Sequence, residues 1–179
     1  MALTIPNRFF PGTLTDGDQV NADFDAVAAY VNGSLETVAT HNSDLALLPK
    51  GKMGYAQVTA TQGSITTPVV DLTSLTLTFT ALASRYYRVS GFGLFASTVA
   101  DDMFTVTITD GAGTQLQQAS IQLRVANVSQ LWTIQYVVQP GAGSKTYKLR
   151  SVRATGSGTG TLTAGATFPN FILIEDIGL

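Results

Sequence analysis

The chain has 179 residues, of which 45% are hydrophobic and 12% charged, and its formal net charge is -2. That length suits one globular domain with an appendage. The charged share lies well below the usual share of about 25%, which indicates a largely uncharged surface. The ten Lys and Arg residues are scattered, which argues against nucleic acid as a partner. Without cysteine, disulfides and thiolate metal sites are excluded.

The sequence shows neither a signal peptide nor a membrane span. Residues 1–15 lack the basic start and the continuous apolar run of a signal peptide. No stretch approaches the roughly 18 apolar residues that a membrane helix needs. We therefore expect a soluble protein without membrane insertion, and the composition leaves its redox compartment open.

Residues 1–15 form an apolar, turn-rich arm. Pro6 and the Pro11-Gly12 pair flank Asn7-Arg8-Phe9-Phe10, and prolines at this density disfavour a regular helix or strand. The adjacent phenylalanines require burial, which leaves two partners open: the chain's own β domain or another protein.

A helix is predicted to begin after this arm. Thr15-Asp16-Gly17-Asp18 has the spacing of a capping box. Apolar side chains then recur every three or four residues, the period that keeps them on one helix face. This apolar stripe consists of Val20, Phe24, Val27, Val31, Leu35 and Val38. Asn32-Gly33-Ser34 interrupts the pattern, because a mid-helix glycine costs about 1 kcal/mol relative to alanine. One bent helix and two short helices both fit.

The apolar stripe needs a partner, because it spans only about three heptads and helices this short are rarely stable alone. The other face is polar, with Asp25, Asn32 and Glu36. The stripe can pack on the chain's own β domain or self-associate around a symmetry axis. Residues 42–52 indicate a helix exit and a linker. We therefore divide the chain into an arm (1–15), a stem with linker (16–52) and a head (53–179).

The head is predicted to be mainly β. Apolar and polar residues alternate in short runs, and the chain contains 25 threonines, a residue that packs well on half-buried sheets. Asp110-Gly111-Ala112-Gly113 is typical of a hairpin turn. Eight to ten strands without intervening helices predict an antiparallel β-sandwich, most simply an eight-stranded jelly roll. The expected strands are 58–61, 65–72, 75–79, 86–95, 104–108, 116–125, 132–138, 147–152, 162–168 and 171–177.

The low charge of the head also bears on its sheet edges. Edge strands are commonly blunted by charged side chains such as lysine. Because few are available here, we expect neighbouring copies of the chain to cover the edges.

No residue pattern indicates catalysis or a cofactor. His41 is the single histidine and has no cysteine beside it, so neither a catalytic triad nor a zinc site is expected. The pairs Asp101-Asp102 and Glu175-Asp176 point to opposite faces of an extended chain, and we interpret them as loop or strand-end charges. Residues 156–160 are interpreted as a flexible hairpin, since no helix follows them to bind phosphate. A hard cation held by loops is left open.

Several aromatic residues of the head could either stack against sugars or fill the core. Their alternation with aliphatic residues favours the core. They are Trp132, Tyr86, Tyr87, Tyr136 and Tyr147.

Both ends of the chain resemble bacteriophage fibre and minor tail proteins. The segment from Phe10 to Phe24, FPGTLTDGDQVNADF, is similar to their virion-attaching start, F-x-x-G-T followed by V-N-A-N-F, with Asp23 replacing the last asparagine. Tyr147-Lys-Leu-Arg150, Gly158-Thr-Gly-Thr-Leu162 and the final FILIEDIG, residues 171–178, resemble the closing strands of phage appendage heads.

The resemblance implies a homotrimeric appendage of the phage particle, such as a head fibre, tail fibre or minor tail protein. Phe9, Phe10 and Pro11 would anchor it to a portal, collar, tail or capsid protein, and the apolar stripe would hold three stems together. The head, similar to tumour-necrosis-factor and collagen-complement heads, would contact the host surface or another virion protein without catalysis.

Two other functions remain open. The head could be a glycan-binding module or a depolymerase of a phage tail, although the absence of an opposed carboxylate pair argues against hydrolysis. It could also be a capsid decoration protein, which would bind particles but not cells.

Overall fold

The computed structural model describes residues 22, 24–33, 45 and 47–179. The chain divides into two units, Met1–Leu48 and Pro49–Leu179, and each is described by itself. The second unit is called the head from here on. Its first strand begins at Gly51, directly after the two residues that start the unit.

In the first unit, residues 24–33 are helical. Phe24, Val27 and Val31 belong to the apolar stripe, and their exposed fractions are 69%, 36% and 46%. No helix in the described ranges is long and apolar enough to cross a bilayer. Whether the segment forms one helix or two depends on residues 34–44, which lie outside the described residues. So do the other residues singled out above for this unit: Phe9, Phe10, Pro11, Thr15, Asp16, Gly17, Asp18, Val20, Leu35, Val38 and His41.

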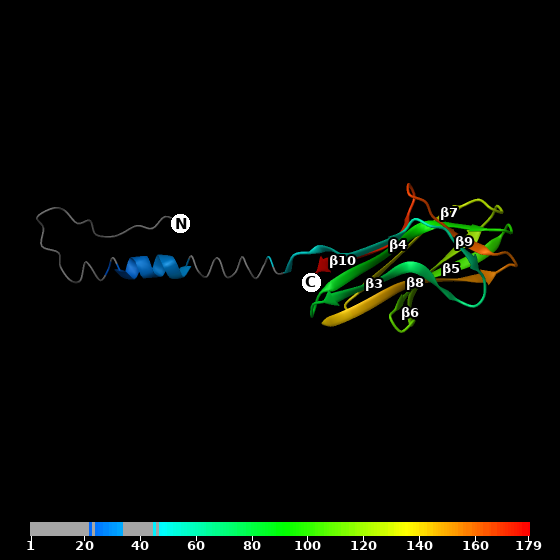
Figure 1. Cartoon of the computed structure of the whole chain (residues 1–179). Coiled ribbons are helices and arrows are strands. Elements are labelled where there is room, and N and C mark those ends of the chain that lie inside the picture. The colour runs from blue at the N-terminus through cyan, green and yellow to red at the C-terminus, as the bar shows by residue number, and fades with distance from the viewer. Residues whose placement is uncertain (1–21, 23, 34–44, 46) are drawn as a thin grey trace, which may run out of the picture. The chain divides into compact units, whose positions relative to one another are not determined.

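Ten antiparallel strands build the head (Figure 1). Short polar and glycine-containing turns separate most of them. The strands are β1 (Gly51–Val58), β2 (Gln62–Ile65), β3 (Val70–Ala81), β4 (Tyr86–Ser97), β5 (Asp102–Asp110), β6 (Gln115–Leu123), β7 (Gln130–Val138), β8 (Gly143–Thr155), β9 (Gly160–Thr163) and β10 (Asn170–Gly178).

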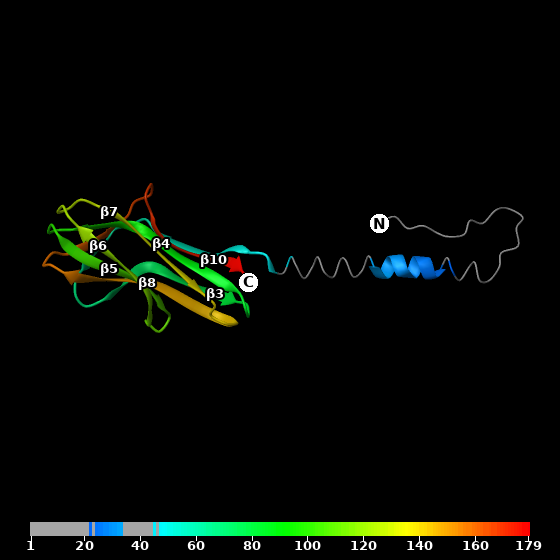
Figure 2. The ribbon, with the colours of Figure 1, turned by 180° about the vertical axis from the view of Figure 1, so that it is seen from behind.

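The strands form two sheets, seen as two layers from opposite sides in Figures 1 and 2. Sheet A has the order β1-β10-β4-β9-β2, and β7 pairs with the other side of β4. Sheet B has the order β3-β8-β5-β6. Five antiparallel pairs are nested in the chain: β1 with β10, β2 with β9, β3 with β8, β4 with β7, and β5 with β6. This is one long hairpin rolled into two layers, which is the topology of a jelly roll.

The fold predicted from the sequence, a mainly antiparallel β-sandwich of the jelly-roll type, is therefore confirmed. The predicted hairpin is present as well, because β5 and β6 pair on either side of the turn from Asp110 to Gln115. Asp110 orders this turn by accepting a hydrogen bond from the backbone N–H of Thr114 at 2.8 Å. That bond also lowers the pKa of the Asp110 carboxyl.

Some strand boundaries differ from those predicted. The expected strand 65–72 is interrupted, because Pro68 has no N–H for the ladder, so that β2 ends at Ile65 and β3 begins at Val70. The expected strand 58–61 is the wrong segment: pairing with β10 makes a strand of Gly51–Val58. Glycines at positions 51 and 54 concealed it, since glycine is depleted in strands.

The core lies between the sheets and follows the alternation of the strands. In β5, Phe104, Val106 and Ile108 are fully buried, while the intervening threonines face outward from sheet B. Each fully buried side chain of this kind contributes about 1.5–3 kcal/mol. Phe95 packs against Phe104 with ring centroids 4.8 Å apart, which joins the two layers.

The aromatic residues assigned to the core mostly lie there. Trp132, Tyr87 and Tyr147 are buried, and Tyr136 packs partly buried against the core. Tyr86 is the exception, because 42% of it is exposed.

The edges of the two sheets lie beside each other. β1 of sheet A contacts β3 of sheet B, and β6 of sheet B contacts β7 of sheet A. Within one chain, this arrangement provides part of the edge protection that the sequence led us to expect from neighbouring copies.

Candidate functional site

The outer face of sheet A carries an aromatic surface, defined by Tyr55, Phe92 and Phe171. Phe92 and Phe171 lie opposite each other on β4 and β10 and stack with centroids 5.2 Å apart. Tyr55 of β1 extends the row at 5.6 Å from Phe171 and is 43% exposed. Contiguous apolar surface of this kind is typical of contact sites.

The local sequence of β4 explains why these rings face outward. Gly91 and Gly93 occupy the inward positions, where an added Cβ would lie 2.9 Å from a Leu149 methyl carbon and 1.9 Å from the Asn170 side-chain oxygen. Phe92 and Leu94 therefore occupy the outward positions. In most strands the apolar residues face the core and the small or polar residues face solvent, whereas the segment Gly91–Leu94 has its glycines facing the core and its apolar residues facing outward. This alternation of glycine and apolar residues is the signal that could have predicted the aromatic surface.

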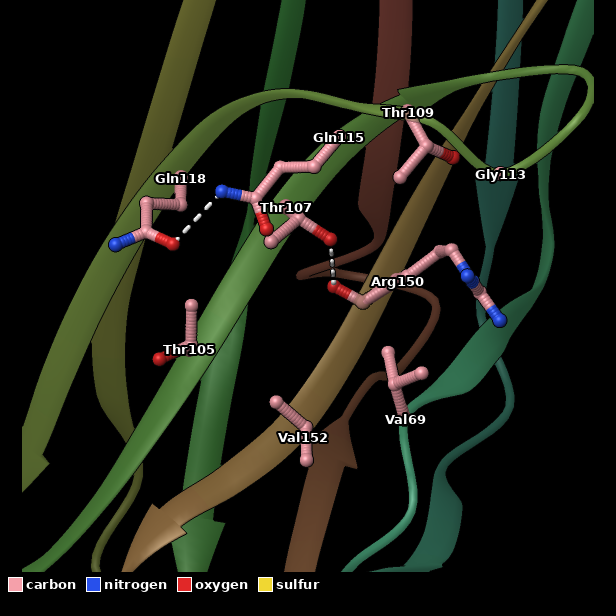
Figure 3. A pocket seen from close by; sticks show the side chains of 9 residues that line it. All are labelled: Val69, Thr105, Thr107, Thr109, Gly113, Gln115, Gln118, Arg150 and Val152. Carbon is pink, nitrogen blue, oxygen red and sulfur yellow. Dashed lines mark hydrogen bonds between the residues drawn. The ribbon is translucent and has the colours of Figure 1, made fainter.

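The outer face of sheet B carries a second feature, which we call the threonine trough (Figure 3). It has a volume of about 360 Å³. Three outward threonines of β5 form its floor, and they are Thr105, Thr107 and Thr109. Thr107 and Thr109 are only 6% and 2% exposed, although they sit on the outer face of the sheet.

Neighbouring strands and turns provide the walls of the threonine trough. Gln115 and Gln118 of β6 line one side, Arg150 and Val152 of β8 the other, and Val69 and Gly113 complete it. The strand register places Thr107 beside both Gln118 and Arg150. An amide, a hydroxyl and a guanidinium thus follow one another across three strands.

The chain has distant structural likenesses among known proteins. No family model and no curated protein matches the sequence. Among solved structures, the chain is similar to a protein of infectious bursal disease virus strain Gx, with 17% identity and a TM-score of 0.41 over 73% of this chain and 37% of the viral chain. This chain thus spans little more than a third of the viral one.

Two further similar structures are carbohydrate-related. The sugar-binding C-terminal domain of EclA has 14% identity and a TM-score of 0.38, over 65% of this chain and 78% of that one. The CBM36-1 domain of a xylanase from the hindgut metagenome of Trinervitermes trinervoides has 14% identity and a TM-score of 0.36, over 70% and 97%. Likenesses this distant carry no information on function.

The acidic pairs lie in a loop or near a strand end, as predicted: Asp101 precedes β5, Asp102 begins it, and Glu175-Asp176 lie near the end of β10. The burial of Asp176, which is only 1% exposed, was not predicted. Its two carboxylate oxygens accept hydrogen bonds from Nη2 and Nε of buried Arg85 at 2.7 and 2.6 Å. Its neighbour Glu175 points to the other face and pairs with Arg88 at 2.7 Å in a partly exposed bridge.

Asp102 organises the loop that was interpreted as a flexible hairpin. Its buried carboxylate accepts hydrogen bonds from the backbone N–H groups of Ser157 and Gly158, at 3.1 and 3.0 Å, and from the Ser97 hydroxyl at 2.5 Å. A Cβ at Gly156 would lie 1.8 Å from the same carboxylate. The glycines are needed for this close approach, and the loop is anchored rather than loose.

Replacing Asp102 with Asn should therefore destabilise the head. An amide nitrogen would replace one acceptor oxygen and face N–H donors, which leaves at least one buried donor unsatisfied at a cost of about 2–3 kcal/mol. We expect a melting temperature lower by about 5–10 °C and faster proteolysis near residue 157. Asp101→Asn is the matched control, because Asp101 is exposed and has a φ of 62° that asparagine tolerates. An equal effect of both variants would contradict this role of Asp102.

Asp102 and Asp176 are occupied by the structural partners described above, and they belong to separate regions of the head. Across residues 22, 24–33, 45 and 47–179, no three His, Cys, Asp or Glu side chains gather as they would around a metal ion.

Proposed function

We propose that this chain is a non-enzymatic structural protein of a bacteriophage virion, a homotrimeric fibre or appendage. Its arm attaches it to another virion protein through Phe9, Phe10 and Pro11. Its stem self-associates through the apolar stripe, and its jelly-roll head contacts the host surface or other virion proteins. Three heads on one stem strengthen weak contacts through their high local concentration.

The apolar helix face carries this proposal. Phe24, Val27 and Val31 lie three and four residues apart along the described helix, which places them on one side of it, and all three are exposed. A helix this short gains most of its stability from packing an amphipathic face, so the face needs a partner. In a trimer, the two other copies would cover this face on each helix, so that all three apolar faces are buried together, as in a short coiled coil.

Two other observations support the proposal. The aromatic surface gives the head an apolar contact area of its own, as is typical of surfaces that bind another molecule. The resemblance of both chain ends to phage appendage proteins agrees with a stem-and-head organisation.

The mass of the full chain in solution tests the proposal. Three copies of the 18.8 kDa chain give about 56 kDa, and we expect this mass by size-exclusion chromatography with multi-angle light scattering. Binding of the full chain to phage particles lacking it would support the structural role. A monomer across the micromolar range would overturn the homotrimer.

A further inference from the structure

The outer faces of the two sheets differ in chemical character. On sheet A the apolar area continues from the aromatic surface onto β7, where Leu131 lies beside Leu94 of β4 and is 59% exposed. The outward positions of sheet B are mostly polar, as shown by Thr76, Thr78, Thr105, Thr107, Gln118 and Lys148. The outer face of sheet A, unlike that of sheet B, therefore has the apolar character of a surface that another molecule covers.

The charged residues on the outer face of sheet A lie at one end of it. Glu175 of β10 lies opposite both Lys52 of β1 and Arg88 of β4, and Arg88 Nη2 is 2.7 Å from Glu175 Oε2. Beyond this end, the outward positions of the described strands β1, β4, β7 and β10 carry no charge. A charged partner therefore finds no opposite charge over the aromatic surface, whereas a second copy of the same neutral surface meets no repulsion there.

The packing of the aromatic rings favours a protein surface over a sugar as the partner. Phe171 lies between Phe92, which stacks on it with centroids 5.2 Å apart and an interplanar angle of 15°, and Tyr55, whose ring centroid is 5.6 Å away. Its ring faces are thus turned toward neighbouring rings, while a sugar needs an open face on which to stack. Ring edges and aliphatic side chains suit the apolar side chains of another protein surface.

The position of β1 along the chain favours a second copy as that protein. Gly51, the first residue of β1, lies three residues after Leu48, the last residue of the first unit, and an extended chain of this length spans about 10 Å. Packed helices lie about 8–10 Å apart, so the three β1 strands of the proposed homotrimer begin close together. Because β1 is an edge strand of sheet A, the same sheets of the three heads are brought near one another.

We propose that the heads of the homotrimer pack against one another through the outer face of sheet A. This head contact rests on the proposed function, since the stem supplies the high local concentration that a weak contact between heads needs. Without the stem, the head contact does not hold copies together at micromolar concentration. The polar outer face of sheet B is the one that stays in solvent.

Single cysteines in the full chain test the head contact, because the chain has no cysteine of its own. Thr133→Cys lies beside Phe92 on sheet A, and Thr76→Cys on the outer face of sheet B is the matched control, since both threonines are exposed in a single chain. Each variant is made with and without Phe24→Asp, and the rate of thiol modification by a polyethylene-glycol maleimide is measured. We expect Thr133→Cys to react at least about tenfold more slowly than Thr76→Cys in the trimer, because the centre of an interface excludes solvent. In the monomeric Phe24→Asp chain the two thiols should react at similar rates.

Light scattering on the same samples separates this proposal from the proposed function. A trimer in which both thiols react equally fast overturns the head contact alone, also if Thr133→Cys becomes protected on phage particles, since another virion protein then covers the surface. Slow reaction of Thr133→Cys that persists in a monomeric Phe24→Asp chain assigns the covering to the chain's own arm and likewise overturns the head contact. An unaltered chain that is monomeric overturns the homotrimer and the head contact together.

Discussion

Replacing Phe24 with Asp should dissociate the proposed homotrimer, so that the mass in solution falls from about 56 kDa to the 18.8 kDa of one chain. Phe24 is 69% exposed in a single chain and belongs to the apolar stripe. In a trimeric stem, the substitution places three carboxylates in an apolar seam, and burying an unpaired charge costs several kcal/mol for each copy. Light scattering over a concentration series measures the effect.

Asn32→Asp is the matched control for this prediction. Asn32 lies on the same helix, is exposed and belongs to its polar side, so that the same charge should leave the mass unchanged. The head should stay folded in both variants, with the melting temperature of the unaltered chain. An unchanged mass for Phe24→Asp would show that the apolar stripe does not hold the oligomer together.

Replacing Asp176 with Asn will destabilise the head more than Asp102→Asn does. The substitution removes the carboxylate charge that faces the guanidinium of Arg85, and the two side chains are only 0% and 4% exposed. Breaking a buried ion pair by removing one partner costs about 3–5 kcal/mol. For a domain of this size, we expect a melting temperature lower by roughly 10–15 °C, measured by calorimetry.

The neighbouring residue supplies the control for this prediction. Glu175→Gln removes a carboxylate from the same strand, but its pair with Arg88 is partly exposed, with side-chain exposures of 41% for Arg88 and 27% for Glu175. Such pairs contribute about 0–1 kcal/mol, so we expect a change of no more than a few degrees. Equal losses in both variants would contradict the special role of the Arg85–Asp176 pair.

The contribution of Asp176 also depends on pH. Burial alone would raise the pKa of its carboxyl, but the hydrogen bonds from Arg85 and from the Gly178 N–H outweigh burial and lower the pKa below its ordinary value. A carboxyl with a lowered pKa in the folded state stabilises the fold above its unfolded pKa and loses this effect as the pH falls. The difference in melting temperature between the unaltered chain and Asp176→Asn should therefore shrink below about pH 4.

The strands and the layer arrangement could be predicted because the alternation of residues reports which face is buried. Phe104, Val106 and Ile108 illustrate this: their spacing of two assigns them to one face, and that face is the core. The nested pairing could not be read in the same way, since alternation fixes the faces of a strand but not its partners. β1 could not be predicted from alternation, because its two glycines disguise the pattern and because the strand is formed by pairing with β10.

The candidate sites were less predictable than the fold. The burial of Asp176 and Asp102 could not be predicted, because each carboxylate and its buried partner are far apart in the sequence: Arg85 lies 91 residues from Asp176, and Gly158 lies 56 residues from Asp102. The lining of the threonine trough could not be predicted, because Gln118, Thr107 and Arg150 become neighbours only when β6, β5 and β8 pair side by side. The outward orientation of Phe92, which stacks on Phe171, follows from the inward glycines on either side of it. Those positions require glycine because Leu149 and Asn170 leave no room for a Cβ there.

The nested strand pairing also sets the order in which the head can assemble during synthesis. β10 lies between β1 and β4 in sheet A, so β1 has no partner in that sheet until residues 170–178 have left the ribosome. Long-range pairing of this kind makes folding slow and leaves unpaired strand edges exposed meanwhile. The stem, by contrast, depends on residues near the start of the chain and is made first. The proposed contacts between stems can therefore form on nascent chains while their heads are still open.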